Sequence, residues 1–246
     1  GLRVVGLMFY DAQIAGLPDS SPAVRLVKRR SDASLRRRRR AARAALERAV
    51  GPLTIVNGGG TGSIELTAGD PSVAVTQYDT ARNMSDRLAA LTVLTHHFAG
   101  SAPAETALSA FYDRFVDDPL VLDKWFMLQA SAPDAGTLDK VIELAAHPAF
   151  RLANPNRARA LLAGLAGLNP YVFHRADGAG YRWMADMLGK LDTLNPQTAA
   201  RMATAFRSWR LMEPLRREAA QAALTELAGR GGLSRDLADI LDRTLR

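Results

Sequence analysis

Four histidines are the side chains of this sequence best suited to bind a metal: His96, His97, His147 and His174. A helical zinc site needs two histidines four residues apart, with a glutamate directly after the first. His96 and His97 are adjacent, so they would point about 100° apart on a helix, and no acidic residue follows at the required offset. Cysteine is absent, which excludes thiolate ligands, disulfides and a cysteine nucleophile. We therefore expect no metal in this chain and histidines that are exposed or partly packed.

Other catalytic patterns are also missing. The chain has no Gly-x-Ser-x-Gly elbow of the kind that presents a nucleophilic serine. A glycine tract, Gly58-Gly59-Gly60-Thr61-Gly62, resembles a phosphate-binding loop in its glycines, but no Gly-Lys-Ser/Thr sequence closes it. We interpret this tract as a flexible spacer. In the segment Asp177-Gly178-Ala179-Gly180-Tyr181 we expect a turn that opens a helix, with Asp177 as its cap.

The net positive charge of the chain comes from its first 60 residues. Residues 1–60 contain eleven arginines and one lysine against four acidic residues, whereas the other 186 residues contain 20 basic and 21 acidic ones. Arg36 to Arg40 form an unbroken run of arginines. A block of like charge is typical of a solvated segment, and the body of the chain has no basic surplus that would read nucleic acid. We therefore do not expect a nucleic acid partner.

The composition is that of a soluble globular protein, with 48% hydrophobic and 23% charged residues. No run approaches the roughly 20 apolar residues of a membrane span, so we expect no membrane partner. The absence of cysteine fits a reducing compartment, and we expect a cytoplasmic location. Because the sequence starts with Gly1, we expect a fragment of a longer chain.

From about residue 70 onward the apolar residues repeat at the three- and four-residue steps of amphipathic helices. The spacing predicts helices over 86–98, 120–130, 138–146, 181–191, 197–211, 215–227 and 236–245. Strand-like alternation is nearly absent after Val75. In the helix over 120–130 we expect Trp125 to be a buried anchor, with Asp123 beside it solvated or weakly paired.

The starts of several helices are marked by a capping residue followed by proline. They are Asp118-Pro119, Asn154-Pro155, Asn169-Pro170 and Asn195-Pro196, and Ser234 resembles a further cap. The side-chain oxygen accepts a first-turn N–H group, and proline at the first helical position lacks only an N–H that would have no partner. Asp118, Asn154 and Asn195 are 36 and 41 residues apart, about the period of HEAT or armadillo helix pairs. We therefore predict an all-α, curved superhelix of antiparallel helix pairs.

Residues 1–70 show no comparable pattern, and we treat them as an irregular basic linker or fragment that precedes a helical domain over 71–246. One helix is predicted in this segment. It lies within residues 35–50 and covers at least 36–48, because alanine and other helix formers are frequent there. A short β-like run, Leu53-Thr54-Ile55-Val56, follows Pro52.

A series of motifs in the helical region resembles the C-terminal helical domain of bacterial aminopeptidase N, also called alanyl aminopeptidase. The resemblance covers about 170 residues, from Gln77 to Arg246. Each motif is weak, but together they occur in the same order and at workable spacing. The motifs are Asn83-Met84-Ser85-Asp86-Arg87-Leu88-Ala89-Ala90-Leu91, Asp123-Lys124-Trp125-Phe126-Met127-Leu128-Gln129-Ala130, Asn154-Pro155-Asn156-Arg157, Phe173-His174 after Asn169-Pro170, Asp177-Gly178-Ala179-Gly180-Tyr181 and Asn195-Pro196-Gln197-Thr198-Ala199-Ala200-Arg201.

The resemblance implies one non-catalytic domain of a zinc enzyme that removes N-terminal residues from small peptides. In that family a separate domain holds the zinc through His-Glu-x-x-His and a distal glutamate, and the free amino group of the peptide through Gly-x-Met-Glu-Asn. Neither motif occurs in this chain, so we expect it to be inactive alone and to have zinc only in the parent enzyme. The family's C-terminal domain caps the active site and lines its substrate cavity, and Gln197 and Arg201 match the cavity residues. The implied partners are the other domains of the parent chain and a small peptide substrate.

One alternative remains open on the residues themselves. Stacked helix pairs form concave surfaces that bind proteins or peptides, so the chain could be a free-standing helical-repeat scaffold. An upstream reading frame that encodes His-Glu-x-x-His would decide for the peptidase domain.

Overall fold

The computed structural model describes residues 4, 6–9, 22–53, 55–58 and 70–246. The chain divides into two compact units, residues 1–109 and 110–246, and the division falls inside helix α5 (Ala102–Phe115). The glycine tract over 59–62 lies outside the described residues, whereas Gly58 ends a strand.

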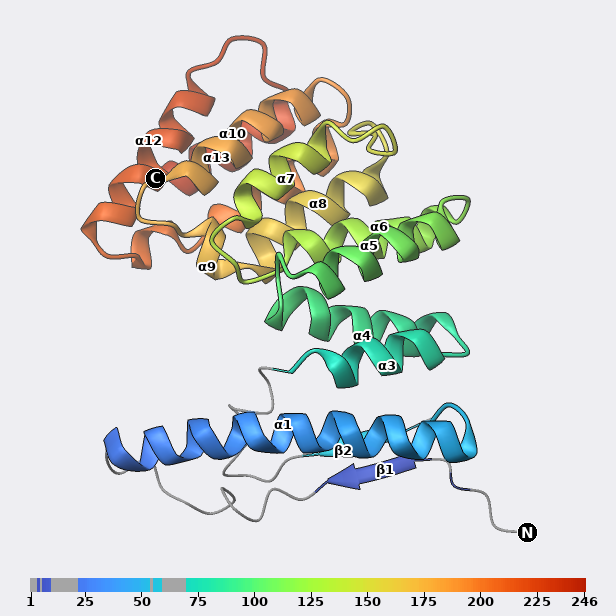
Figure 1. Ribbon diagram of the computed structural model, residues 1–246. Helices are drawn as coiled ribbons and strands as arrows, with labels where there is room; N and C mark the ends of the chain where they lie inside the picture. The colour runs from blue at the N-terminus through green and yellow to red at the C-terminus, as the bar shows by residue number, and fades with distance from the viewer. Residues whose placement is uncertain (1–3, 5, 10–21, 54, 59–69) are drawn as a thin grey trace. The chain divides into compact units, whose positions relative to one another are not determined.

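The first unit begins with a parallel strand pair joined through a long helix (Figure 1). Strand β1 (Gly6–Phe9) pairs with β2 (Ile55–Gly58), with Gly6 opposite Ile55. Helix α1 (Pro22–Val50) lies between them in the sequence, as a parallel connection requires. The helix that we predicted over 35–50 is the second half of α1, and the β-like run at 53–56 overlaps β2. The described part of this segment is therefore more regular than the sequence indicated.

Two helices complete the first unit beside the start of α5. Helices α3 (Ser72–Thr80) and α4 (Met84–His97) pack against each other, and α3 also contacts β2. Asn83 caps α4 by accepting a hydrogen bond from the Asp86 backbone N–H at 2.8 Å. Leu53 is fully buried in this unit.

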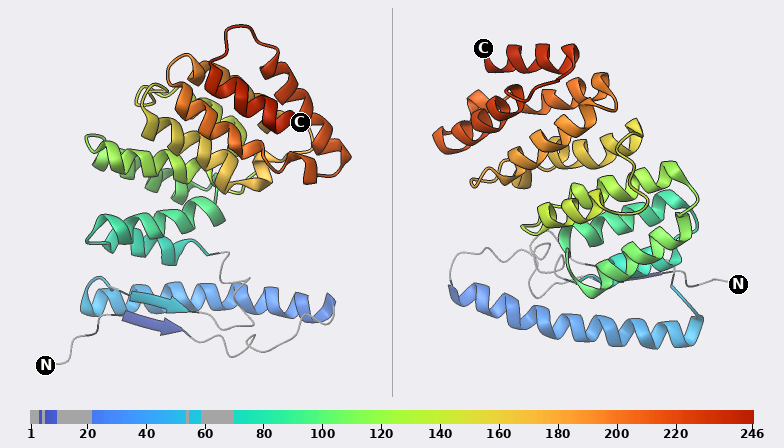
Figure 2. Two further views of the ribbon diagram at one scale, coloured as in Figure 1. Left: turned by 180° about the vertical axis from the view of Figure 1, so that it is seen from behind. Right: turned by 90° about the horizontal axis from the view of Figure 1, so that it is seen from above.

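The second unit consists of helix pairs stacked in chain order (Figure 2). Its helices are α6 (Pro119–Ala130), α7 (Thr137–Ala145), α8 (Pro155–Leu168), α9 (Pro170–Phe173), α10 (Ala179–Asp192), α11 (Pro196–Ala203), α12 (Pro214–Ala228) and α13 (Arg235–Leu245). Helices α6, α8, α11 and α13 contact one another in succession, and α7, α10 and α12 each pack on one or two members of that layer. The prediction of an all-α fold built from repeated helix pairs is confirmed.

The predicted helix caps are confirmed. Asp118, Asn154, Asn169, Asn195 and Ser234 each accept a hydrogen bond from a first-turn N–H, and proline occupies the first turn of α6, α8, α9 and α11. Asp177 accepts from the Ala179 N–H at 3.0 Å, while Gly178 takes a left-handed conformation with φ 68°. These local signals fix where each helix starts, and therefore which residues face the next layer.

The helix predicted over 197–211 is wrong in its second half. Helix α11 ends at Ala203, and two short 3-10 turns follow, Thr204–Phe206 and Trp209–Leu211. The Thr204 hydroxyl donates to the Arg201 carbonyl, and the Trp209 indole N–H donates to the Thr244 carbonyl at 2.9 Å. Phe206 and Trp209 are both buried, and the three-residue repeat of 3-10 turns brings both to the core.

Close contact between α6 and α8 depends on one glycine. A Cβ atom at Gly164 would lie 2.9 Å from the Ala130 Cβ and 3.1 Å from the Met127 carbonyl oxygen. A second close approach occurs at Gly180, where a Cβ would lie 2.5 Å from the Phe173 carbonyl oxygen. Small residues therefore set the spacing of neighbouring helices in this unit.

Candidate functional site

Gln197 and Arg201 lie one turn apart on α11, and both side chains are exposed. Ala199 and Ala203 are on the opposite, buried side of the same helix. Two small residues allow α11 to pack closely on α10 and α13. The Asn195 side chain fixes the start of the helix by accepting from the Thr198 N–H at 3.0 Å. The four-residue spacing of Gln197 and Arg201 puts both side chains on the same face of the helix.

The Arg201 side chain makes no ion pair or hydrogen bond within the part of the chain that the structure describes. A guanidinium group of this kind keeps its donors available for a carboxylate, which it can bind through two parallel hydrogen bonds. The Gln197 amide can both donate and accept. The two side chains therefore form a polar surface suited to a peptide backbone or carboxylate, and we call it the α11 polar face.

His174 belongs to an aromatic cluster that joins α9, α10 and the 3-10 turn Thr204–Phe206. Its Nδ1 atom lies 2.8 Å from the Tyr181 hydroxyl, and Tyr181 also contacts Phe173 edge-on at 5.2 Å. The Arg216 guanidinium donates to the His174 carbonyl. Burial, followed by the charge of Arg216, lowers the pKa of His174, and burial raises the pKa of Tyr181. Both groups are therefore neutral at pH 7, and their role is to hold helices together.

His147 is also a packing residue. Its ring lies 5.2 Å from Tyr112 and 5.6 Å from Trp125, and its Nδ1 atom accepts from the Ala149 N–H at 3.1 Å. Burial, followed by the nearby Arg157 charge, lowers the pKa of His147. His96 and His97 lie in the last turn of α4. Among the described residues, no three His, Cys, Asp or Glu side chains converge as a metal site would require.

The prediction for Asp123 is wrong. Asp123 accepts a hydrogen bond from Nε of Arg157 at 2.5 Å, and the Arg157 side chain is only 7% exposed. The Arg157 guanidinium also donates to the carbonyls of Ala149 and Pro119 and lies 4.9 Å from the centre of the Phe126 ring. This arginine therefore ties α6, α8 and the segment between α7 and α8 together. Sequence reasoning missed it because the two charged residues are 34 positions apart.

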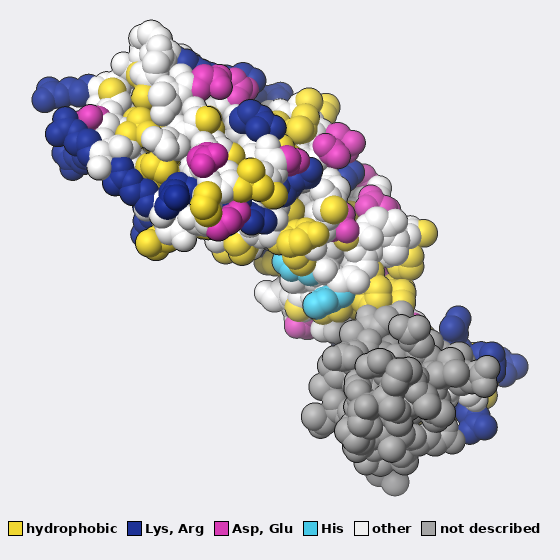
Figure 3. Space-filling view, turned by 90° about the vertical axis from the view of Figure 1, so that its left-hand side faces the viewer, with side chains coloured by type: hydrophobic (Ala, Val, Ile, Leu, Met, Phe, Trp, Pro, Cys, Tyr) yellow, Lys and Arg dark blue, Asp and Glu magenta, His cyan; other side chains and the backbone are white. Residues whose placement is uncertain are grey.

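The exposed charges of the second unit are mixed in sign. Figure 3 shows both basic and acidic side chains on the helical surface that faces the viewer, with apolar side chains between them. Several are paired along one helix, such as Lys190 with Asp186 and Arg243 with Asp239. None of the helices in the described residues is long and apolar enough to cross a bilayer.

Comparison with known proteins places this arrangement in a family. Residues 61–246 match the family model described as a domain of unknown function (DUF3458_C) with ARM repeats. The chain therefore belongs to this family of armadillo-repeat domains. The match includes every helix of the second unit, as well as α3, α4 and α5.

Its curated relatives include three bacterial proteins named aminopeptidase N. The identity is 39% over 170 residues with the Escherichia coli protein, 38% over 168 residues with that of Caulobacter vibrioides and 37% over 169 residues with that of Haemophilus influenzae. These matches cover 68–69% of this chain but 19% of the length of each relative. The crystal structure of Legionella pneumophila aminopeptidase A in complex with aspartic acid matches with a TM-score of 0.66 and 28% identity, over 71% of this chain and 20% of that one.

Proposed function

We propose that this chain is the C-terminal helical domain of a zinc aminopeptidase that releases N-terminal residues from small peptides. The observation that carries the proposal is the 37–39% identity to three aminopeptidase N proteins over about a fifth of their length. A domain of this size within a larger enzyme has the other domains of the parent chain as its partners. In this proposal the parent enzyme would act in the cytoplasm, a reducing compartment that suits a chain without cysteine.

In this proposal the domain contributes shape and binding rather than catalysis. The described residues contain no metal-binding group, so zinc would be held by another domain of the parent. The isolated chain is then expected to bind no stoichiometric zinc and to cleave no alanyl substrate. Zinc analysis of the purified chain and an assay with alanyl amides test both statements, and activity that co-purifies with the chain would contradict them.

The α11 polar face is the part of the domain that would line the substrate cavity. Arg201 would bind the C-terminal carboxylate or the backbone of a peptide, because its planar group matches a carboxylate and stays charged. Gln197 would accept or donate according to the peptide presented. The exposure of both side chains on one helix supports this role.

The test is Arg201→Ala in the full-length parent enzyme. We expect the transition-state stabilisation for dipeptides and tripeptides to fall by about 1–3 kcal/mol, the range of a charged hydrogen bond. Single-residue amide substrates should be little affected because they have no such carboxylate. The loss should appear mainly in KM, since the contact would be equal in the ground and transition states. Arg207→Ala, at another exposed arginine just beyond α11, is the matched control.

Equal, negligible effects of Arg201→Ala on peptides and amides would show that Arg201 is a surface residue only. The second candidate function, a free-standing scaffold that binds a protein or peptide, is favoured by the armadillo-type helix pairs. The parent gene separates the two, because a scaffold would have no His-Glu-x-x-His sequence upstream in the same reading frame.

A further inference from the structure

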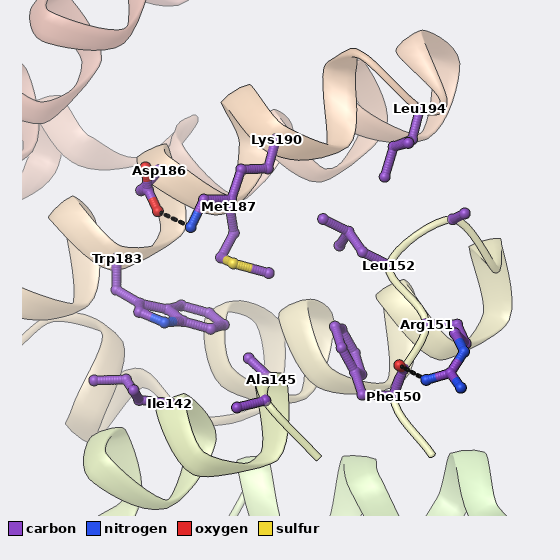
Figure 4. Close-up of a pocket in the computed structure, with 12 residues that line it drawn as sticks. Ile142, Ala145, Phe150, Arg151, Leu152, Trp183, Asp186, Met187, Lys190 and Leu194 are labelled. Atoms are coloured by element: carbon purple, nitrogen blue, oxygen red, sulfur yellow. Dashed lines mark hydrogen bonds and ion pairs between the residues drawn. The ribbon is translucent and has the colours of Figure 1, made fainter. Parts of the chain in front are cut away.

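A pocket of about 650 Å³ opens between α7, the segment over 146–153 and α10 (Figure 4). Neither Gln197 nor Arg201 lines it. Its larger apolar side chains are Ile142, Phe150, Leu152, Trp183, Met187 and Leu194, and Ala145 also lines it. The volume lies within the roughly 300–1,000 Å³ of small-molecule sites, which are mostly apolar with a few polar groups. The pocket is therefore large enough for a compact organic ligand.

The apolar lining is buried at the base of the pocket and exposed at its rim. Met187 and Phe150 are almost fully buried, whereas Ile142 is 47% and Leu194 54% exposed. Figure 4 shows the Trp183 ring and the Met187 side chain directed into the space between α7 and α10. An apolar ligand would cover the rim residues and remove their surface from water, which is the main favourable term in such binding.

The charges at the pocket are not balanced. Asp186 is already neutralised, because Lys190 lies 2.7 Å and Arg230 3.4 Å from its carboxylate oxygens. The Lys190 hydrogen bond lowers the pKa of Asp186, so this carboxylate stays ionised and engaged. On the other side, Arg151 donates through Nη1 to the Phe150 and Pro148 carbonyls. Among the described residues no carboxylate pairs with Arg151, and its Nε and Nη2 donors remain available.

We propose that this pocket binds an apolar carboxylate: a hydrocarbon or aromatic body between α7 and α10, with its carboxylate on Arg151. The apolar side chains of the pocket contact the hydrocarbon or aromatic part of the ligand, and Arg151, the one unpaired cation of the lining, binds its carboxylate. Arginine suits this task because its fork can bind both oxygens of a carboxylate. The site is separate from the α11 polar face, and it stands whether or not the proposed peptidase role is correct.

Two probes distinguish the source of such a ligand. 4-Phenylbutyrate represents a free organic acid, and N-acetyl-phenylalanine represents the C-terminal end of a peptide. Each is titrated into the full chain by calorimetry, beside its uncharged amide. We expect at least one acid to bind about two- to fivefold more tightly than its amide, the range of an accessible charge pair. The acid that binds better identifies the source.

Variants assign the binding to this pocket. Arg151→Gln should reduce the preference for acid over amide to near unity, while Arg207→Gln, away from the pocket, should leave it unchanged. Ala145→Leu should narrow the space between α7 and α10 and weaken the binding of acid and amide alike, with helicity by circular dichroism as the control for folding. Equal affinities of acid and amide, affinities that Ala145→Leu leaves unchanged in a folded chain, or no binding of either acid would each overturn the proposal.

Discussion

In helix α1, Arg37, Arg38 and Arg40 are exposed, whereas in helix α8 the Arg157 side chain is only 7% exposed. The exposed arginines belong to a helix with a large excess of positive charge and no acidic residue in its first turn. The Arg157 guanidinium donates hydrogen bonds to a carboxylate and two carbonyls and lies against an aromatic ring. The contribution of an arginine to stability therefore depends on the partners that tertiary packing brings to it, because only desolvated charges interact strongly.

The largest effect is expected from Arg157→Ala. It leaves Asp123 without its cation and the Ala149 and Pro119 carbonyls without a donor, so the free energy of unfolding should fall by about 3–5 kcal/mol. Arg38→Ala in α1 should change it by less than about 0.5 kcal/mol, as exposed substitutions usually do. Urea denaturation of both variants measures the difference. Similar losses in the two would break the comparison between the units.

Asn169→Ala should come next. Asn169 is buried, caps α9 through the Val172 N–H and donates to the carbonyls of Ala130 and Ala132 at 3.1 and 2.7 Å. Its loss leaves buried polar groups unpaired, and we expect a destabilisation of about 2–3 kcal/mol. Asn154→Ala removes a cap that faces solvent and should cost only about 1 kcal/mol. If the order of the two variants in thermal unfolding is reversed, burial is not what distinguishes these caps.

Smaller changes in stability, of opposite sign, are expected when two glycines of α8 are each replaced by alanine. Gly164→Ala should destabilise by about 1–2 kcal/mol, because its Cβ would overlap Ala130 and the Met127 backbone. Gly167→Ala has nothing within 4 Å of the added Cβ, so it should stabilise the helix by about 0.5–1 kcal/mol. Denaturation midpoints with unchanged m-values would test this. A stabilised Gly164→Ala variant would show that α6 and α8 can separate without loss.

The smallest effect is expected from deletion of residues 1–70. The charge excess and the exposed arginines of this segment indicate a small contribution to the stability of the helical domain, although Leu53 is buried within the first unit. The remaining chain should unfold cooperatively, with the midpoint temperature lowered by less than about 4 °C. Differential scanning calorimetry of the full and shortened chains gives the comparison. Loss of a cooperative transition after the deletion would contradict the separation between a basic segment and a helical domain.

The helix starts in the body could be predicted because their causes are local. Asn154 and Asn195 accept hydrogen bonds from N–H groups two or three residues away, and the proline after each fixes φ near its helical value. The same local patterns gave the helix-pair period, and with it the armadillo-type fold. The helix prediction failed where contacts with distant segments outweighed the local pattern. After Ala203 the chain forms 3-10 turns, because these allow Phe206 and Trp209 to be buried in the core.

The candidate sites divide in the same way. Gln197 and Arg201 were placed on one helical face by their four-residue spacing alone, because helix geometry fixes that relation. The pocket between α7 and α10 had no signal in the sequence, since Phe150, Trp183 and Leu194 come from separate elements. The pairing of Arg157 with Asp123 likewise joins residues 34 positions apart. The sequence by itself determined most helices of the second unit, their caps and their repeat. Only tertiary structure decided which charges are buried and where a cavity forms, because both depend on contacts between segments distant in the chain.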